Sequence, residues 1–252
     1  MIDLSRLSAA VRSLDVATDF DAAQRALTEV ATAINMPTLA WSPDVSRPMF
    51  NPHMDAFLRR QGWSEEVLSL WWDRSVMLRT PIYIRCRTHA MPFVTGRQAW
   101  RAPVQRELLS IAQAMERMGV ETLITAPVHL PRGQIAMVTW GGPQDAAAAE
   151  ALLAAARIEL IAAAHLFLAA YHTLADPGGA TEEETVRFTP REWECLRLTA
   201  QGCREDDVAS LVGIAATTVR FHLDNAVRKL GASNRVHAVA RAAQLGILGP
   251  IS

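Results

Sequence analysis

The residues with the clearest chemical potential lie near the C-terminus, where basic and hydrogen-bonding side chains share one predicted helix. Between Val212 and Ser252, Asp224 is the only acidic residue among five basic ones. A helix over 216–230 would turn its apolar residues to a core and its polar residues to solvent. Such a helix fits the DNA major groove, where residues near its N-terminus reach base edges and flanking basic groups meet phosphates. The residues expected at base edges are Thr217, Thr218, Arg220 and His222, and those expected at phosphates are Arg228, Lys229 and Arg235.

Four short helices are expected to position these residues. Thr189, Pro190 and Glu192 have the types and spacing of an N-cap, a first helical residue and the third residue of a capping box. A glycine follows each apolar-periodic segment, as is usual at helix C-termini. The middle two helices form a helix-turn-helix candidate, although spacing alone also fits an interaction bundle with a solvated basic face. The predicted helices are 190–200, 205–212, 216–230 and 234–245.

Upstream, two adjacent tryptophans precede a threonine–proline pair in the stretch Leu70–Pro81. Tryptophan is costly to bury unless its indole N–H finds a partner, so this stretch either lines a site or packs on itself. Two apolar runs, Thr122–Leu130 and Gln134–Trp140, are joined by turn residues typical of a hairpin. The expected fold is α+β: an N-terminal α-β-α sandwich with an antiparallel sheet, then a C-terminal all-α four-helix helix-turn-helix domain. Further helices are expected at 20–34, 54–60, 65–76, 104–118 and 145–172, with another strand at 36–41.

The boundary between the two domains is marked by Pro177-Gly178-Gly179 and the glutamates that follow. These residues break regular structure and favour a solvated strip. We therefore predict one domain at 1–173, a linker at 174–187 and a second domain at 188–252.

Composition narrows the function classes. The 252 residues carry a net charge of −1, and without an uncharged apolar run of about 18 residues we expect no membrane span. No secretory signal begins the chain, so a cytoplasmic location is expected. Cys86, Cys195 and Cys203 form an odd set without paired spacing, which predicts reduced thiols. His165 and His172 lack a third ligand at metal spacing, and catalytic signatures are absent, so neither a metal, a cofactor nor enzyme activity is expected.

Residues Phe188 to Leu248 resemble the DNA-binding domain of LuxR-type regulators. The family's near-invariant positions there fall on Glu192, Leu196 and Gly202, and all three match. Cys203 stands where the family usually has a lysine, and Arg204 beside it is an alternative phosphate contact. The resemblance implies binding of double-stranded promoter DNA, expected at a two-fold symmetric site, with RNA polymerase as a further candidate partner. Self-pairing through the fourth helix would use Val236, Val239, Ala240 and Ala243.

Residues 15–170 resemble the acyl-homoserine-lactone-binding domain of quorum-sensing receptors, most clearly over Ser69–Arg87 and Ala126–Trp140. A phosphorylated receiver domain is excluded, because a receiver uses a lysine beside its acidic pocket and this part of the chain has none. The resemblance implies a ligand buried between the sheet and one helical layer. It also implies that residues 1–173 serve as an autoinducer-binding-like sensor and dimerisation domain.

The lactone-recognition positions of that family fall on changed residues. Its tyrosine falls on Trp71, its aspartate on Thr80, and its two tryptophans on Val67 and near Thr95. Loss of the charged acceptor and of one donor would weaken a standard lactone by ~3–5 kcal/mol. The proline and a threonine seen in several receptors match at Pro81 and Thr139, whereas Leu123 replaces a usual glycine. The candidate pocket residues are Trp63, Val67, Trp71, Thr80, Thr95 and Thr139.

The resulting hypothesis is a cytoplasmic, homodimeric transcriptional regulator with an altered or vestigial acyl-homoserine-lactone pocket. A small hydrophobic signal other than a standard acyl-homoserine lactone is the first expected occupant. Two alternatives remain open: a ligand-independent regulator whose tryptophans fill the space, and a module that heterodimerises with another LuxR-type protein and modulates it.

Overall fold

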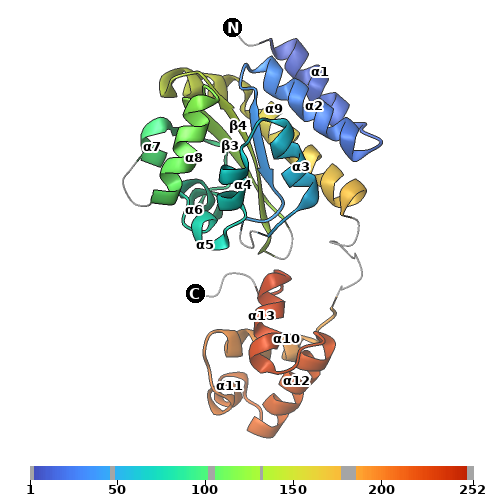
Figure 1. Cartoon of the computed structure of the whole chain (residues 1–252). Coiled ribbons are helices and arrows are strands. Elements are labelled where there is room, and N and C mark those ends of the chain that lie inside the picture. Colours follow the sequence, from blue (N-terminus) through green and yellow to red (C-terminus); the bar gives the residue numbers. More distant parts are fainter. Residues whose placement is uncertain (1–2, 46–48, 102–105, 131–132, 177–185, 249–252) are drawn as a thin grey trace. The chain divides into compact units, whose positions relative to one another are not determined.

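The computed structural model describes residues 3–45, 49–101, 106–130, 133–176 and 186–248 (Figure 1). The chain divides into two compact units, one holding the sheet and the other holding the C-terminal helices. Most of the predicted linker at 174–187 lies outside the described residues. Each unit is described by itself below.

The first unit is built on a four-stranded antiparallel sheet with the order β1-β4-β3-β2. Strands β3 and β4 form the predicted hairpin, in which Thr125 lies opposite Thr139. Nearly every residue of these two strands is buried, because helices cover both faces of the sheet. The predicted α+β fold class is confirmed. The strands are β1 Thr38–Ser42, β2 Phe93–Gly96, β3 Thr122–His129 and β4 Ile135–Gly142.

One face of the sheet packs against the long helix α9, Ala146–Ala170, which also contacts α1 and α2. Trp41 of β1 meets Phe167 of α9 edge-on, with 5.3 Å between ring centroids. Alternate strand residues point to the other face, where α6 packs on β3 and β4 and where α4 contacts α8. The remaining helices are α1 Leu4–Asp15, α2 Phe20–Ala33, α3 Pro52–Arg60, α4 Glu65–Trp71, α5 Arg74–Met77, α6 Pro81–Thr88, α7 Arg97–Arg101 and α8 Arg106–Arg117.

Helix α9 continues into a short π-helix, η2, at Tyr171–Ala175. Together they span Ala146–Ala175, which is long and apolar enough to cross a membrane by length and composition alone. The core helix of a folded domain meets the same test. Leu160 and Phe167 are fully buried, and the helix packs on β2, β3 and α1, so we assign it to the core of this unit.

Two differences from the predicted elements have local causes. The helix expected at 65–76 is divided into α4 and α5, because the Asp73 carboxylate accepts a hydrogen bond from the Ser75 N–H at 2.8 Å and caps a new helix. Helix α6 was not predicted, although Thr80 is its N-cap and Pro81 its first residue. The sequence therefore marked the start of α6, but its short length gave little periodicity.

The described residues of the second unit form four helices, and the predicted bounds agree with the structure to within a residue. The Glu192 N–H donates to Thr189 Oγ1 at 3.3 Å and the Thr189 N–H donates to Glu192 Oε2 at 2.8 Å, which completes the predicted capping box. Buried residues from all four helices form one core, including Leu196, Val208 and Leu223. The helices are α10 Pro190–Ala200, α11 Glu205–Val212, α12 Ala216–Lys229 and α13 Arg235–Gln244.

Candidate nucleic-acid interface and ligand cavity

Helix α12 follows α11 after a tight turn. Gly213 ends α11 with φ 72°, a left-handed conformation that glycine adopts without the Cβ penalty. The Val219, Leu223 and Ala226 side chains of α12 are buried in the core. The four residues predicted at base edges therefore gather on the outward part of its first half. Thr217 and Arg220 are exposed, and Thr218 and His222 are half-buried.

Phe221 was missed as a candidate contact. Its side chain is 61% exposed and follows Arg220 directly on α12. An aromatic side chain on a groove-facing helix can contact a thymine methyl group. The signal in the sequence was an apolar residue lying outside the stripe of Val219 and Leu223.

Lys229, predicted at a phosphate, makes internal contacts. Its ammonium group donates to Glu192 Oε2 at 2.5 Å and to the Arg187 carbonyl at 3.1 Å. The Glu192 side chain is only 5% exposed, so Lys229 supplies the counter-charge for a carboxylate in the core. Burial raises the pKa of Glu192, but hydrogen bonds from Lys229 and the Thr189 N–H outweigh it and lower that pKa. Lys229 thus has a structural role that its sequence position did not indicate.

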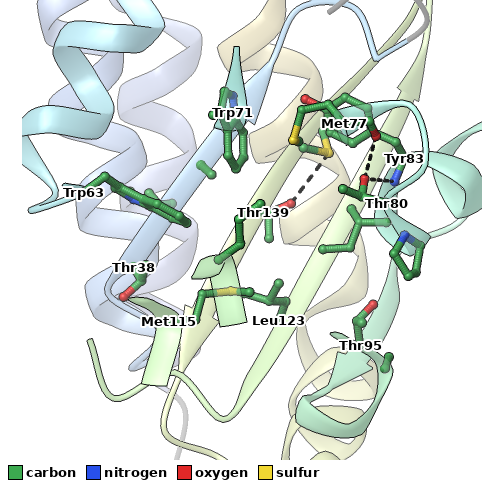
Figure 2. A pocket seen from close by; sticks show the side chains of 17 residues that line it. Thr38, Trp63, Trp71, Met77, Thr80, Tyr83, Thr95, Met115, Leu123 and Thr139 are labelled. Carbon is green, nitrogen blue, oxygen red and sulfur yellow. Dashed lines mark hydrogen bonds between the residues drawn. The ribbon is translucent and has the colours of Figure 1, made fainter. Parts of the chain in front are cut away.

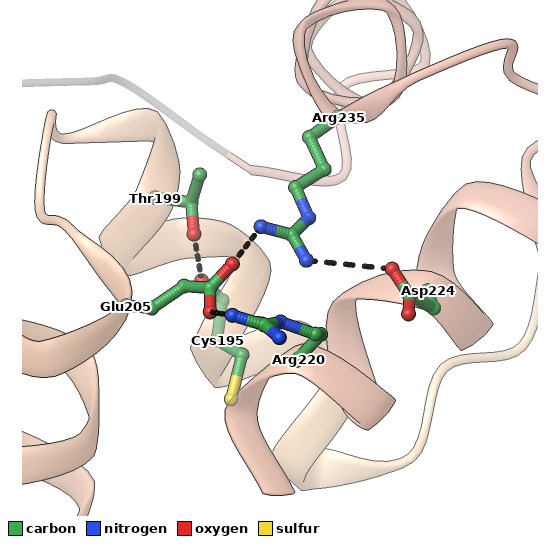
Figure 3. Close-up of polar contacts among 6 residues, drawn as sticks. All are labelled: Cys195, Thr199, Glu205, Arg220, Asp224 and Arg235. Atoms are coloured by element: carbon green, nitrogen blue, oxygen red, sulfur yellow. Dashed lines mark hydrogen bonds and ion pairs between the residues drawn. The ribbon is translucent and has the colours of Figure 1, made fainter. Parts of the chain in front are cut away.

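Arg220 and Arg235 meet at Glu205, the first residue of α11 (Figure 3). Arg220 Nη2 lies 2.9 Å from Glu205 Oε2, and Arg235 Nη1 donates to Glu205 Oε1. Arg235 Nη2 also lies 3.4 Å from Asp224 Oδ1. Hydrogen bonds from Arg235 and Arg220 lower the pKa of Glu205, so the group is a carboxylate at neutral pH. The cluster joins α11, α12 and α13, and it places a predicted phosphate contact, Arg235, between two acids.

The other predicted contacts of this unit lie at its surface. Arg228 is exposed and donates to Asn225 Oδ1 at 2.7 Å. Arg204 is exposed immediately before α11, beside the half-buried Cys203. On α13, Val236 is 81% exposed. The other residues predicted to pair two copies are also accessible to a partner: Ala240 and Ala243 are exposed and Val239 is half-buried.

In the first unit, a cavity of about 70 Å³ lies between the sheet and the helices α4 to α8 (Figure 2). Five of the six predicted pocket residues line it: Trp63, Trp71, Thr80, Thr95 and Thr139. In the view of Figure 2, the two tryptophans lie on one side, Thr80 and Thr95 on the other, and Thr139 between them. Among the residues that the structure describes, no charged side chain lines the cavity. The other lining residues are Thr38, Leu39, Ala40, Met77, Pro81, Ile82, Tyr83, Ala99, Ile111, Met115, Leu123 and Met137.

Three of the cavity threonines, Thr80, Thr95 and Thr139, have hydrogen-bond partners within the protein. Thr80 Oγ1 donates to the Met77 carbonyl at 2.9 Å and accepts from the Tyr83 N–H at 3.4 Å. Thr139 Oγ1 lies 3.1 Å from Thr125 Oγ1 on the neighbouring strand. Thr95 Oγ1 accepts from Arg85 Nη1 at 3.5 Å. Each of these three hydroxyls has at least one partner without any further molecule.

The tryptophans differ from the threonines in this respect. Trp63 and Trp71 meet edge-on with 5.5 Å between ring centroids, and the buried Trp63 Nε1 has no hydrogen-bond partner in the described structure. Trp72 points elsewhere, since its Nε1 donates to Asp55 Oδ1 at 3.0 Å on α3. Val67 is fully buried but does not line the cavity. It lies one turn before Trp71 on α4, but its shorter side chain does not reach the cavity.

Two buried ionisable groups near the cavity, Tyr83 and Cys86, stay neutral. Burial raises the pKa of Tyr83, so its phenol keeps its proton. Burial also raises the pKa of Cys86 to about 12, and its Sγ lies 3.9 Å from Met137 Sδ. A buried neutral thiol is a poor nucleophile. The cavity can therefore enclose an apolar molecule, and one of its lining residues, Trp63, has an unpartnered indole N–H.

A cavity-bearing α-β-α unit joined to a helix-turn-helix unit defines a transcriptional regulator with a sensor-type domain. Residues 19–171 match the family described as autoinducer binding domain, and residues 186–242 match bacterial regulatory proteins of the luxR family. The chain belongs to the LuxR family of quorum-sensing regulators, whose members are not enzymes. Its helix-turn-helix unit implies DNA binding.

Several known proteins are similar to this chain. The quorum-sensing-dependent regulator RpaR of Rhodopseudomonas palustris is 28% identical over 205 residues, which cover 80% of this chain and 79% of RpaR. The activator PhzR of Pseudomonas fluorescens is 37% identical over 95 residues, 38% of this chain and only 34% of PhzR. Escherichia coli SdiA shares the fold with a TM-score of 0.55 at 17% identity, over 98% of this chain and 99% of SdiA. A complex of SdiA with octanoyl-rac-glycerol gives 0.57 at 16% identity, over 97% and 96% of the two chains.

Proposed function

We propose that this regulator binds a two-fold symmetric promoter site as a homodimer, and that its sensor cavity responds to a small hydrophobic molecule other than a standard acyl-homoserine lactone. The observation that carries the DNA part is the exposed face of α12. Arg220 is exposed there beside Thr217 and Phe221, and the opposite face of the helix is buried in the core. Bidentate arginine contacts to guanine are the commonest specific contacts in the major groove.

Exposed small and apolar residues support the homodimer. Alanines at 147, 151, 154 and 155 are exposed along α9, and Ile158 there is 78% exposed. Val236 on α13 is an exposed apolar residue of the second unit. Apolar patches of this kind, rimmed by charges, commonly mark protein interfaces. Two copies of α12 would then read two half-sites, which is why a symmetric site is expected.

The chemistry of the cavity defines the ligand class. Apolar walls favour an aliphatic or aromatic body, and the unpartnered Trp63 N–H calls for one hydrogen-bond acceptor. A lactone amide would need an acceptor at Thr80, but that hydroxyl is neutral and already caps α6. A space of about 70 Å³ is small, so we expect a larger ligand to bind only if lining side chains such as Trp63 or Trp71 move.

A second candidate is ligand-independent regulation, alone or by heterodimerisation with a related regulator. The internal hydrogen bonds of Thr80, Thr95 and Thr139 favour it, because they let the unit fold without an occupant. RNA polymerase is the further partner expected of a transcriptional regulator. A cytoplasmic location follows from action on promoter DNA, and we propose no metal, cofactor or membrane partner.

Two measurements test the proposal. Binding of the purified full chain to promoter fragments from its own genome should weaken steeply with salt, because phosphate contacts release counterions. Absence of a salt-sensitive complex with any fragment would exclude the DNA function.

Mass spectrometry of small molecules released from the protein purified from its own organism tests whether the cavity holds a ligand. A bound apolar molecule with one acceptor supports the proposal, whereas an empty, DNA-binding dimer favours ligand-independent regulation.

A further inference from the structure

Arg220 is held along one edge by a residue of the neighbouring helix. Its Nε and Nη2 atoms both donate to Glu205 Oε2, at 3.2 and 2.9 Å (Figure 3). The Glu205 side chain is 23% exposed and that of Arg220 is 63% exposed. The carboxylate is therefore largely covered, while the guanidinium extends into solvent.

This geometry leaves the outer fork of the guanidinium open. Arginine has five N–H donors, and the pair on Nε and the near side of Nη2 is used by Glu205. The Nη1 hydrogens and the second Nη2 hydrogen remain, and within the described part of the chain Nη1 of Arg220 has no hydrogen-bond partner. That outer fork matches the O6 and N7 acceptors of guanine.

Glu205 is itself fixed from a third helix. Its Oε1 accepts from Arg235 Nη1 on α13, and Arg235 is held by Asp224 as well. The fork of Arg235 is thus divided between two acids. Because Arg235 fixes the Glu205 carboxylate, this acceptor keeps its position when Arg220 changes rotamer. The Arg220 rotamer that hydrogen-bonds to Glu205 is therefore favoured.

We propose that Glu205 is a positioning residue for base recognition, which holds Arg220 by its inner edge so that the outer fork is presented to a guanine in the major groove. The inference rests on the proposed function, because Arg220 must lie at a base edge. An arginine that is already ordered loses less conformational freedom on binding, and the saving favours the base that accepts both donors.

The test is base preference measured for the full chain on a library of random-sequence duplexes. Arg220→Ala should lose the preference for guanine at one base pair of each half-site by about five- to 150-fold. Glu205→Ala should reduce that same preference by about three- to tenfold and leave other positions unchanged. Glu205→Gln, which keeps an acceptor and the side-chain volume, should lie between Glu205→Ala and the wild type. The double variant should match Arg220→Ala, because Glu205 acts through that residue.

Glu194→Ala is the matched control, since Glu194 forms an exposed pair with Arg191 on α10 and its loss changes net charge equally. Glu205→Ala effects that Glu194→Ala reproduces, or a uniform loss on all sequences, would overturn the positioning role. So would an unchanged preference in Glu205→Gln if Glu205→Ala fails to fold. A wild-type chain that enriches no sequence would overturn the proposed function itself, whereas enrichment with an indifferent Glu205 overturns this inference alone.

Discussion

The cavity and the recognition helix of this protein place their polar groups in opposite ways. On α12, Thr217 and Arg220 extend to solvent, where an external partner can reach them. In the cavity, Thr80 and Thr139 bond to the protein itself. The DNA-binding unit therefore presents open donors, while most polar groups at the cavity are used within the protein. Of the tryptophans that line the cavity, Trp63 has a buried indole N–H without a partner in the described structure.

The two functions depend on different parts of the sequence. Which polar side chains a helix turns to solvent depends on its local periodicity, which can be read from a short segment of sequence. The chemistry of a cavity depends on which side chains meet from distant segments, so one changed residue alters the needs of several others. A sensor can thus diverge in ligand while its DNA-binding unit keeps the family pattern.

The largest expected effect is a loss of stability when Lys229 is replaced. It would distinguish this structural cation from the cations that we expect to contact DNA. Lys229→Met leaves the Glu192 carboxylate without its counter-charge in the core, and should lower the free energy of unfolding by about 2–4 kcal/mol. Chemical denaturation followed by circular dichroism measures it. The neighbouring Arg228→Met is the control, since Arg228 is exposed and contacts Asn225, and should change stability by less than about 0.5 kcal/mol.

The ion pair between Lys229 and Glu192 also makes the stability of this unit depend on pH. The pKa of Glu192 is lowered in the folded chain, so its stabilisation is present above the ordinary value of 4.5 and is lost as the pH falls through the lower folded value. Lys229→Met should lose less stability on acidification than the wild type. Equal acid sensitivity, or equal stability of the two variants at neutral pH, would assign Lys229 to the DNA-facing set after all.

The next prediction tests whether the exposed Arg220 contacts a base. Arg220→Ala should weaken binding to the preferred duplex by about 1–3 kcal/mol, because a bidentate base contact is lost. Fluorescence anisotropy at fixed salt measures this loss. Arg191→Ala removes the same charge from an exposed pair on α10 and serves as the control. A similar loss in both variants would mean that Arg220 contributes charge and no base contact.

The internal hydrogen bond between Thr125 and Thr139 predicts that single and double substitutions differ in their cost. Thr139→Val should destabilise the first unit by about 1–2 kcal/mol, since it leaves the fully buried Thr125 hydroxyl without its partner. Replacing both threonines by valine should cost less than either single change. Urea denaturation of the wild type, the two single variants and the double variant gives the coupling energy. Additive losses would show that the two hydroxyls do not depend on each other.

Sequence patterns predicted the helices of the second unit almost completely, because caps and terminal glycines are local signals. They also brought Trp63, Trp71 and Thr139 to one cavity through the family resemblance. The contacts that could not be predicted join residues far apart in the chain. Glu205 meets Arg235 across 30 residues and Lys229 meets Glu192 across 37. No local pattern distinguishes such a cation from one that faces a phosphate.

The smallest effect concerns Thr80, which is the N-cap of α6 and also lines the cavity. Its hydroxyl caps α6, so Thr80→Ala should lower stability by about 0.5–1 kcal/mol, whereas Thr80→Ser keeps the acceptor and should stay near the wild type. Thermal unfolding with and without the apolar extract of the native cells measures both properties. Cap loss alone predicts that the extract raises the melting temperature of all three proteins equally. A shift that disappears only in Thr80→Ala would instead make this hydroxyl a ligand contact, and the cavity would then resemble α12 in keeping a polar group for an external partner.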